Sequence, residues 1–564
     1  MKVKSMKNTP KIQGNQQVVV IGGGFSGLAT AGLLAASGHR VTLLEKQKNL
    51  GGRAGRLERE GFSFDTGPSW YLMPEVIEHW FELMGTSTKQ ELDLVDLHIG
   101  YRTWFEDEET PLDMPTGVGA EAAFESLQPG AGAALRDYLR TAQESYTLAL
   151  GHFLYDGFSS VKSFLNPKLL GMLPQLAPLL TGSLDSYVAK RFTDPRLRQI
   201  LGYPAVFLGS SPKHTPALYH LMSHLDLTQG VKYPMGGFAR LVDSMTEICV
   251  AAGVKINTEA RVTGIDTVNI ARTNSVDAVR WTGPDSVPGT EHRLEADVVI
   301  GAADLHHLET ELLPERLRSS SPASWKRRDP GPSAVLLCLG VSGKLPDLSH
   351  HNLLFTKDWD DNFGRILRGE NLLPETSMYV CMPSSTDPSV APADHENLFI
   401  LVPSPALPQW GTGGADGTGS PAVEAVADAA LDQLARWSGI EDLRERVVVR
   451  QSFGPADFVN NVNAWQGGAL GLAHTLGQSA FFRPSNHSSK VQGLYYAGSS
   501  VRPGIGIPMC LISAEIIAKA VNGIKDAGPF DLAHPQVLEK NTRSAHRFPG
   551  GTADPARSGK LDAR

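Results

Sequence analysis

Short apolar runs separated by glycine-rich turns mark the first fifty positions of the chain. Residues Gln17 to Ile21 form a continuous β-branched run, which is typical of a strand buried in a parallel sheet. A stretch of small and apolar residues follows, and a second run, RVTLLE, ends at Glu45. This order predicts a strand, a helix and a second parallel strand at the N-terminus.

The apolar pattern later in the chain predicts further strands of the same sheet. Gly253 to Asp266 and Ala296 to His307 contain short β-branched runs, and we expect them to rejoin the first sheet. In Gly493 to Val521, a strand ends at Gly498, a glycine-proline loop follows, and a helix begins near Pro508. Leu184 to Met245 instead has apolar positions at helical spacing, as a helical core would.

Composition excludes several classes of protein. The chain has 564 residues, of which 41% are hydrophobic and 20% charged, with a net charge of −8. This length suggests two or more structural units, and the acidic balance argues against nucleic-acid binding. The four cysteines form no CxxC pair, so we expect neither a metal site nor a disulfide framework.

Neither end of the chain has a targeting or membrane-spanning pattern. The N-terminus is basic and polar without an apolar core, and no run approaches the roughly 20 apolar residues of a spanning helix. The tail after about Lys525 is polar and rich in helix breakers. We therefore expect residues 1–15 and 526–564 to be disordered tails.

The first turn carries the pattern of a dinucleotide site. Gly22, Gly24 and Gly27 fit G-x-G-x-x-G between strand and helix. The first glycine permits a tight turn, the second lets a phosphate approach the backbone closely, and the third lets the helix pack on the strand. The helix N-terminus offers free N–H groups to the phosphates. Glu45 can accept hydrogen bonds from a ribose hydroxyl and would repel a 2′-phosphate. The predicted contacts here are Gly22, Gly24, Phe25, Ser26, Gly27, Glu45 and Lys46.

A second turn distinguishes between cofactors. Gly51, Gly52 and Arg53 follow the second strand, and an arginine there can pair with pyrophosphate oxygens. A plain NAD-linked dehydrogenase has no need of it. A β-turn with an ordinary surface arginine is the alternative interpretation.

The combined motifs GGGFSGL, LLEK and LGGRAGRLEREGFSFDTGPSWYLMP resemble the FAD-dependent amine oxidase superfamily. Within it, the chain is most similar to bacterial carotenoid desaturases of the phytoene type. The resemblance implies that Gly52 and Arg53 lie along the FAD pyrophosphate. It also implies that Gly67, Pro68 and Ser69 lie near the flavin, and that Val262 touches the adenine side. From sequence alone, an ordinary buried strand valine is the better interpretation of Val262.

The C-terminal segment also resembles this family, with departures. The implied flavin contacts are Gly498, Ser499, Gly506, Ile507, Pro508 and Met509. A helix starting there would stabilise the negative charge of reduced flavin. Related desaturases often have Thr-His-Pro-Gly where this chain has Val501-Arg502-Pro503-Gly504, and many flavoproteins have an acid at the position of Ser499.

The expected fold is α/β, with a Rossmann-type FAD-binding domain, a discontinuous α+β substrate domain and a helical membrane-contact region. We assign residues 16–110, 228–308 and 485–525 to the FAD-binding domain. Residues 111–227 and 309–484 then form the substrate-binding domain.

The resemblance implies an enzyme that dehydrogenates 15-cis-phytoene, an apolar isoprenoid, to lycopene or a less desaturated carotene. Oxidised FAD would take a hydride from an allylic carbon, the neighbouring carbon would lose a proton, and oxygen or a quinone would reoxidise the flavin. The sequence identifies no proton acceptor and leaves the oligomeric state open.

A lipid-dissolved substrate implies peripheral, monotopic contact with the cytoplasmic side of the membrane. Val161 to Leu180 combines apolar residues with Lys162 and Lys168, so it could dip into one leaflet. A buried cap helix of the substrate domain is the alternative interpretation of this segment.

Other functions fit the same scaffold. One group comprises other flavin oxidoreductases: a diapophytoene desaturase, a carotenoid ketolase or isomerase, an amine oxidase or a protoporphyrinogen oxidase. An amine oxidase would be expected to have an aromatic cage near the flavin, which the sequence does not locate. The other alternative is an isoprenoid-binding escort protein without redox chemistry, and it would hold no yellow flavin.

Overall fold

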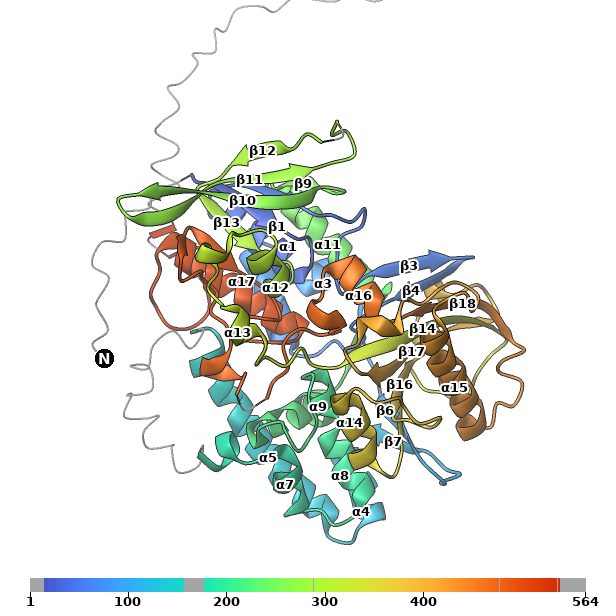
Figure 1. Cartoon of the computed structure of the whole chain (residues 1–564). Coiled ribbons are helices and arrows are strands. Elements are labelled where there is room, and N and C mark those ends of the chain that lie inside the picture. The colour runs from blue at the N-terminus through green and yellow to red at the C-terminus, as the bar shows by residue number, and fades with distance from the viewer. Residues whose placement is uncertain (1–14, 157–176, 288, 476, 535, 538–564) are drawn as a thin grey trace, which may run out of the picture.

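Three larger sheets, two two-stranded sheets and covering helices make up the described part of the molecule (Figure 1). The structure is a computed structural model that describes residues 15–156, 177–287, 289–475, 477–534 and 536–537.

The N-terminal strands belong to a five-stranded parallel sheet. Its order is β20 (Leu494–Tyr496), β13 (Val298–Gly301), β1 (Gln17–Ile21), β2 (Arg40–Leu44) and β9 (Lys255–Asn257). Residues Val18 to Ile21 pair with β13 on one side and with Val41 to Leu44 on the other. The predicted α/β class with a parallel nucleotide-binding sheet is confirmed. The strands come from three distant parts of the chain, so the sheet is complete only when the last strand is added.

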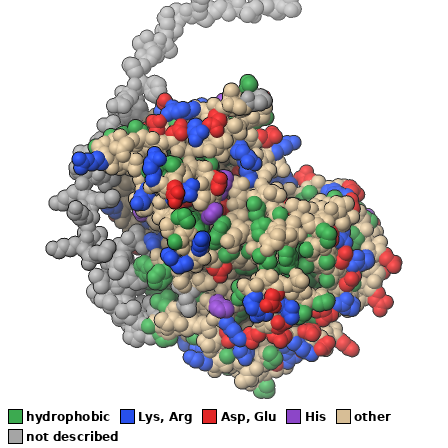
Figure 2. Space-filling model, viewed as in Figure 1, with side chains coloured by type: hydrophobic (Ala, Val, Ile, Leu, Met, Phe, Trp, Pro, Cys, Tyr) green, Lys and Arg blue, Asp and Glu red, His purple; other side chains and the backbone are tan. Residues whose placement is uncertain are grey.

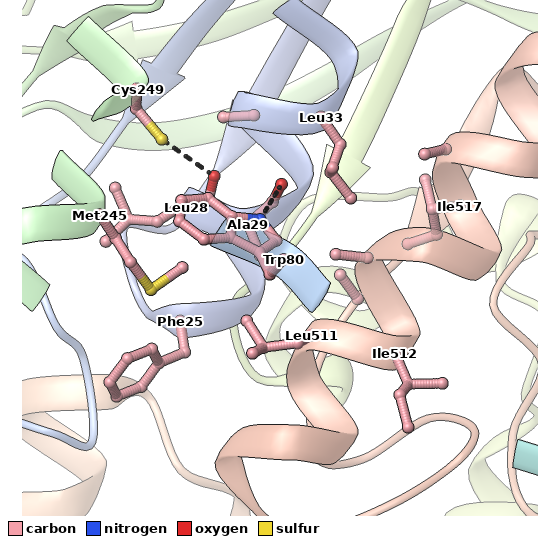
Figure 3. Packing of buried hydrophobic residues seen from close by; sticks show 14 of the residues in the cluster. Phe25, Leu28, Ala29, Leu33, Trp80, Met245, Cys249, Leu511, Ile512 and Ile517 are labelled. Atoms are coloured by element: carbon pink, nitrogen blue, oxygen red, sulfur yellow. Dashed lines mark hydrogen bonds between the residues drawn. The ribbon is translucent and has the colours of Figure 1, made fainter. Parts of the chain in front are cut away.

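Helices α1 (Phe25–Ala36) and α17 (Ile507–Asn522) pack together against this sheet. Figure 3 shows Phe25, Leu28 and Leu33 facing Leu511, Ile512 and Ile517 of α17. Polar groups of two flanking helices bond to the backbone of α1. The Cys249 Sγ of α11 (Gly237–Ala251) donates to the Leu28 carbonyl at 3.2 Å. The Trp80 Nε1 of α2 (Pro74–Leu83) donates to the Ala29 carbonyl at 3.4 Å. This core fixes the start of α1.

A smaller sheet covers the opposite face of the parallel sheet. Its strands are β10 (Arg261–Ile270), β11 (Thr273–Thr282), β12 (His292–Glu295) and β19 (Val491–Gln492). Val262 and Ile265 of β10 share a buried cluster with Val19 and Ile21 of β1.

A seven-stranded mixed sheet forms the second half of the molecule. Its order is β18 (Val447–Phe453), β14 (Ser333–Ser342), β17 (His395–Ser404), β16 (Met378–Cys381), β15 (His351–Phe355), β6 (Ile99–Phe105) and β7 (Leu112–Pro115). Alternate residues of β14 face two different cores: Leu337 and Leu339 pack with α15 (Pro421–Ser438), while Leu336 and Cys338 face an aromatic-rich cluster. Both faces of β14, next to the edge strand β18, are therefore buried.

Shorter elements connect these layers. The small strands are β3 (Arg56–Arg59), β4 (Phe62–Asp65), β5 (Leu94–Asp96) and β8 (Lys232–Pro234). The remaining α-helices are α3 (Thr88–Glu91), α4 (Val118–Leu127), α5 (Ala131–Ala149), α7 (Leu184–Ala189), α8 (Pro195–Gly202), α9 (Pro204–Phe207), α10 (Met222–His224), α12 (Leu305–Thr310), α13 (Pro322–Trp325), α14 (Trp359–Arg368) and α16 (Pro455–Val462). The 3₁₀ and π turns are η1 (Leu150–Leu154), η3 (Ala217–Leu221), η4 (Leu225–Gln229), η5 (Glu315–Leu317), η6 (Pro383–Ser385), η7 (Pro388–Val390), η8 (Pro408–Trp410), η9 (Trp465–Gly467) and η10 (Ala480–Phe482).

Part of the expected C-terminal tail is ordered, which corrects the prediction of disorder from residue 526. Phe530 is 1% exposed, and its N–H donates to the Glu515 carboxylate at 2.9 Å. The Lys519 ammonium donates to the Tyr155 carbonyl at 3.0 Å and to that of Asp526 at 3.3 Å. Buried charges on α17 thus hold this segment, a contact that its polar composition does not reveal. Residues 1–14 and 538–564 lie outside the described part.

The expected membrane segment is mostly outside the described residues, because the structure describes only 177–180 of 161–180. In the part of the chain that is described, no helix is long and apolar enough to span a bilayer. On the face shown in Figure 2, acidic and basic side chains are interspersed.

Candidate cofactor site

The three motif glycines have different surroundings. Gly22 has φ +107°, and a methyl group there would lie 2.9 Å from the Ala302 carbonyl oxygen. A methyl group at Gly27 would lie 1.9 Å from the Gly22 carbonyl oxygen, so this position tolerates only glycine. At Gly24 the nearest atom would be 3.6 Å away. Gly22 and Gly27 therefore shape the turn, whereas Gly24 leaves its backbone open to a ligand.

The first turn of α1 presents its backbone to this opening. The helix begins after Gly24, and no side chain among the described residues caps it. Phe25 and Ser26 are buried at 6% and 5% exposure, which fixes the turn in place. Free N–H groups at a helix start favour an anion such as a phosphate.

Glu45 ends β2 beside the same turn. Its Oε2 accepts the Gly23 N–H at 2.7 Å, and its Oε1 accepts the Gln47 N–H at 2.8 Å. Each carboxylate oxygen can accept a second hydrogen bond, so both remain available to ribose hydroxyls. Lys46 points elsewhere: its Nζ donates to the Asn460 carbonyl at 2.8 Å and to Asn463 Oδ1 at 2.7 Å. Burial lowers the pKa of Lys46 to about 8.

Val262 lies close to the end of β2. The Ala260 N–H, two residues earlier, donates to the Glu45 carbonyl at 2.8 Å. Val262 itself is 8% exposed in the cluster with Ile21 and Leu44. The side chain is therefore part of the core, on a strand that starts beside the ribose-binding carboxylate.

The second turn packs directly on the first. The Gly51 N–H donates to the Gly23 carbonyl at 2.9 Å, and a methyl group at Gly52 would lie 3.3 Å from the Gly24 Cα. Arg53 Nε donates to the Ala469 carbonyl at 2.9 Å, while its Nη2 lies 3.8 Å from Asp304 Oδ2. This Nη2 is buried and has no hydrogen-bond partner. The alternative of a surface arginine therefore does not hold.

These features fit FAD. A buried donor without an acceptor destabilises a fold by about 1–3 kcal/mol, and a pyrophosphate oxygen would satisfy the Arg53 guanidinium. We call the Gly22–Gly27 turn, Glu45 and the Gly51–Arg53 turn the cradle. It combines a helix start, a ribose acceptor and a cation.

The Gly67–Ser69 turn rests on the cradle. A methyl group at Gly67 would lie 2.0 Å from the Arg53 carbonyl oxygen, so these two turns are in backbone contact. After Pro68, Ser69 Oγ donates to the Gly67 carbonyl at 3.3 Å. Ser69 also lines a small cavity of about 10 Å³, room for about one water molecule, beside the seven-stranded sheet. The other lining residues are Phe64, Asp65, Tyr233, Cys381, Pro383, Asn397 and Phe399.

The C-terminal loop closes the other side of the α1 start. Gly498 has φ +114°, and a methyl group there would lie 3.1 Å from Ser26 Oγ. Gly506, with φ +116°, precedes α17. Ile507, Pro508 and Met509 form its first turn, and no side chain within the described ranges caps it. The structure thus brings the N-terminal and C-terminal predicted residues together, with Lys46 turned aside.

Two buried residues that sequence reasoning missed hold this loop. Arg483 is 1% exposed, and its guanidinium donates to the carbonyls of Val501 at 3.0 Å, Leu472 at 2.9 Å and Ser499. Burial lowers its pKa to about 10. The Ser499 carbonyl is therefore occupied by protein, while the Arg502 Nη2 bonds to the Phe481 carbonyl at 2.8 Å.

His474 is the second missed residue. Its Nε2 accepts the Ile505 N–H at 3.1 Å, which leaves Nδ1 to donate to the Tyr219 hydroxyl. Burial lowers the pKa of His474 well below its usual value, so the ring stays neutral. A methyl group at Gly504 would lie 2.3 Å from this ring. No pattern around Arg483 or His474 signals these contacts in the sequence.

A small cavity of about 10 Å³ lies beside the cradle. Its walls combine Asp304 and Ser500 with two tryptophans, Trp325 and Trp465. Because Asp304 also faces Arg53, we treat this space as part of the cofactor site.

The structure also groups three potential metal ligands, two adjacent histidines and a cysteine 30 positions later. The ligand atoms of His350, His351 and Cys381 lie within 4.8 Å of one another, and all three residues are buried. Burial raises the pKa of the Cys381 thiol to about 12. A thiol that stays protonated is a poor metal ligand, so this chemistry disfavours a metal here.

A comparison with family models matches residues 25–522 to "Flavin containing amine oxidoreductase". A carotenoid 3,4-desaturase of Haloarcula japonica is 41% identical over 509 residues, covering 90% of this chain and 98% of the relative. A phytoene desaturase of Fusarium fujikuroi is 31% identical over 91% of this chain and 90% of its own length. A 4,4'-diapophytoene desaturase (4,4'-diaponeurosporene-forming) of Staphylococcus haemolyticus is 30% identical over 89% and 98%.

Solved structures share the fold at lower identity. An oxidoreductase from Methanosarcina mazei superposes with a TM-score of 0.55 at 17% identity, covering 89% of this chain and all of the other. Putrescine oxidase bound to putrescine gives 0.55 at 15% identity, covering 90% and 99%.

Proposed function

Because the chain belongs to the family of flavin-containing amine oxidoreductases, we propose that this FAD-dependent oxidoreductase is a carotenoid desaturase. The observation that carries the proposal is the 41% identity to a carotenoid 3,4-desaturase across 90% of the chain. The resemblance read from the sequence motifs is thereby confirmed at the level of the family. An escort protein without flavin does not fit a chain with an intact cradle.

The substrate we propose is an acyclic C40 carotenoid, with 15-cis-phytoene as the first choice and lycopene or a less desaturated carotene as product. Relatives named for phytoene, for diapophytoene and for the 3,4 position all match most of the chain. The candidate substrates therefore differ in the length of the carotenoid and in the bond that is dehydrogenated. Oxygen or a quinone is the proposed final oxidant.

When bound, FAD supplies the hydride acceptor for each dehydrogenation. The protein holds it through the open backbone at Gly24, the Glu45 carboxylate and the Arg53 guanidinium. The start of α17 places backbone N–H groups and the positive end of a helix dipole beside the C-terminal loop, which would stabilise negative charge there. Arg483 keeps that loop rigid by satisfying its carbonyls.

A substrate without polar groups must be held by apolar contact and shielded from water. The small cavity next to Ser69 is lined in part by Phe64, Phe399 and Tyr233 and holds about 10 Å³, so a polyene would have to widen it by moving side chains. At about 25 cal/mol per Å² of apolar surface buried, contact with these rings would favour polyene binding.

The test is anaerobic. The protein is reconstituted with FAD on liposomes that contain 15-cis-phytoene, lycopene or a C30 analogue, and the visible spectrum is followed. Bleaching of the flavin together with new polyene bands supports the proposal, and the band positions count the double bonds. A flavin that stays oxidised with all three carotenoids contradicts it. Bleaching by amines instead would favour an amine oxidase.

We also propose peripheral membrane contact, since the substrate dissolves in lipid. Among the described residues, Phe482 is 74% exposed and Leu180, at the end of the expected segment, is 42% exposed. Flotation of wild type with liposomes is compared with the double variant Leu170→Asp and Leu173→Asp, and with Phe482→Asp. Equal flotation of all three would remove both segments from the proposal.

A further inference from the structure

A cluster of large rings stands directly behind the Gly67–Ser69 turn. Trp70 stacks on His351 with ring centroids 4.8 Å apart and planes at 20°. Its ring is also 5.5 Å from Tyr101 and 5.9 Å from Tyr203. We call these rings, with Phe207 and Tyr379, the aromatic cluster. It adjoins the small cavity of about 10 Å³ through Ser69 and through Cys381, which pairs with His351.

An acidic side chain is buried at the edge of this cluster. Asp226 lies in the π-helical turn η4 and is 4% exposed. Its Oδ2 accepts a hydrogen bond from the Tyr203 hydroxyl at 2.7 Å, whereas its Oδ1 is buried without a partner. The residues on either side, Leu225 and Leu227, are each 1% exposed.

The fold does not explain this carboxyl group. It caps no helix and, within the described residues, it forms no ion pair, so only hydrogen bonds offset the cost of burying its charged form. An unpaired acid in a core is therefore more often functional than structural. Single π turns inside helical segments are also frequent at functional sites.

The surroundings set how this group holds a proton. Burial raises the pKa of Asp226 to about 7, although the hydrogen bond from Tyr203 lowers that pKa in part. The titratable groups that face it are the phenols of Tyr101, Tyr138 and Tyr203, whose own pKa values burial raises. Nearby histidines are weaker bases: burial lowers the pKa of His220 to about 4.

We propose that the hydrogen-bonded pair Tyr203–Asp226 receives the proton that leaves the carotenoid in each dehydrogenation. This inference rests on the proposed function. One allylic C–H bond breaks with both electrons, and the flavin accepts that hydride. A C–H bond on the neighbouring carbon then breaks, its electron pair forms the new C=C bond, and the proton passes to the Tyr203 oxygen. The phenolic proton of Tyr203 moves at the same time to Asp226 Oδ2.

The aromatic cluster serves the same step. Positive charge that develops on the polyene is attracted to the faces of tryptophan and tyrosine rings. In this arrangement Tyr203 is the catalytic residue that touches the substrate, and Asp226 is the positioning residue that holds its proton.

The experiment compares the FAD-loaded wild type with Asp226→Asn, Asp226→Glu and Tyr203→Phe. The matched control is Tyr146→Phe, which removes another buried tyrosine–carboxyl hydrogen bond, to Glu75. Flavin reduction by carotenoid is measured anaerobically from pH 6 to 8.5. Infrared spectra of the FAD-loaded protein without substrate follow the Asp226 carboxyl over the same range.

The wild-type rate should rise with pH through a midpoint near 7. Asp226→Asn and Tyr203→Phe should lose about 10²–10³-fold at pH 8, with a flat profile for Asp226→Asn. Asp226→Glu should recover to within about tenfold of wild type. The infrared carboxyl band should titrate near neutral pH in wild type and be missing from Asp226→Asn.

The inference is overturned if Asp226→Asn keeps the wild-type rate and pH profile, or if wild type has no carboxyl that titrates near neutral pH. Because burial also raises the pKa of Asp65 to about 6, the band assigned to Asp226 is the one that titrates nearer 7 and that is absent from Asp226→Asn or shifted in Asp226→Glu. Failure of the proposed function is a separate outcome, because wild-type flavin then stays oxidised with every carotenoid while the infrared titration is still measured.

Discussion

The cradle and the aromatic cluster are neighbours that are built in opposite ways. In the cradle, side chains are missing: Gly22, Gly27 and Gly67 bring backbone against backbone at separations that exclude a methyl group. In the aromatic cluster, large side chains fill the space and leave polar atoms such as Trp70 Nε1 and Asp226 Oδ1 without partners. The cofactor side is thus shaped by backbone, and the substrate side by side chains.

This difference separates two kinds of constraint. Backbone contacts leave no room to adjust, so one added carbon in the cradle should remove the cofactor. Ring packing can rearrange, so changes in the aromatic cluster should alter the chemistry before they alter the fold. The following predictions test this contrast.

Gly27→Ala should have the largest effect. Its methyl group would lie 1.9 Å from the Gly22 carbonyl oxygen, so the turn must open. We expect no bound flavin and a loss of at least about 4 kcal/mol in the free energy of unfolding. Flavin absorbance of the purified protein measures the bound cofactor, and denaturant unfolding measures the loss of stability. Gly151→Ala is the control, because nothing lies within 4 Å of its Cβ position. Retained flavin in Gly27→Ala would contradict a rigid cradle.

Arg483→Met should come next, because it leaves the carbonyls of Leu472, Ser499 and Val501 without their donor. We expect a loss of about 4 kcal/mol in the free energy of unfolding. Arg140→Met, at an exposed ion pair, should change stability by less than about 0.5 kcal/mol. Similar melting curves for both variants would mean that the C-terminal loop does not depend on Arg483.

Asp226 should make stability depend on pH. Its pKa is raised to about 7 in the folded protein from 3.8, so between these values the folded state binds the extra proton. Its contribution is therefore most favourable at low pH and is lost as pH rises toward 7. Between pH 5 and 7 the wild type should lose about 2 kcal/mol of unfolding free energy through this group, and Asp226→Asn should not show that loss. Denaturant unfolding at pH 5 and pH 7 measures this difference. If the unfolding free energy changes equally with pH in wild type and variant, Asp226 does not have the raised pKa.

Arg53→Met should have the smallest effect on stability and a clear one on affinity. It removes the buried Nη2 that lacks a hydrogen-bond partner, but also the Nε donor to the Ala469 carbonyl and the cation facing Asp304, so the apoprotein should lose about 1 kcal/mol of unfolding free energy. FAD binding should weaken by about 2 kcal/mol, or roughly 30-fold, in a flavin titration. Arg56→Met removes a partly exposed pair with Asp243 and should leave the affinity unchanged. An unchanged affinity in Arg53→Met would place the pyrophosphate elsewhere.

The same contrast explains what the sequence could predict. The strand, glycine turn and helix from residue 17 onward lie within thirty residues, so their spacing carries the geometry. Arg483 and Asp226 act through partners that only the fold brings near: Asp226 meets Tyr203 across 23 positions. Isolated polar residues in apolar surroundings look alike in sequence whether they are buried or exposed. The ordered segment around Phe530 was missed for the same reason, since its contacts come from α17.

The order in which the parallel sheet is assembled has a consequence for synthesis of the protein. β1 and β2 are synthesised first. The edge strand β20, in which Leu494 pairs with Val299 of β13, is synthesised about 450 residues later. The helix that packs on α1 follows even later, at Ile507–Asn522. On the ribosome, the cofactor side therefore cannot close until nearly the whole chain has emerged. Premature termination anywhere before α17 leaves the apolar face of α1 uncovered, so truncated products should be recognised by chaperones and proteases rather than accumulate as partial flavoproteins.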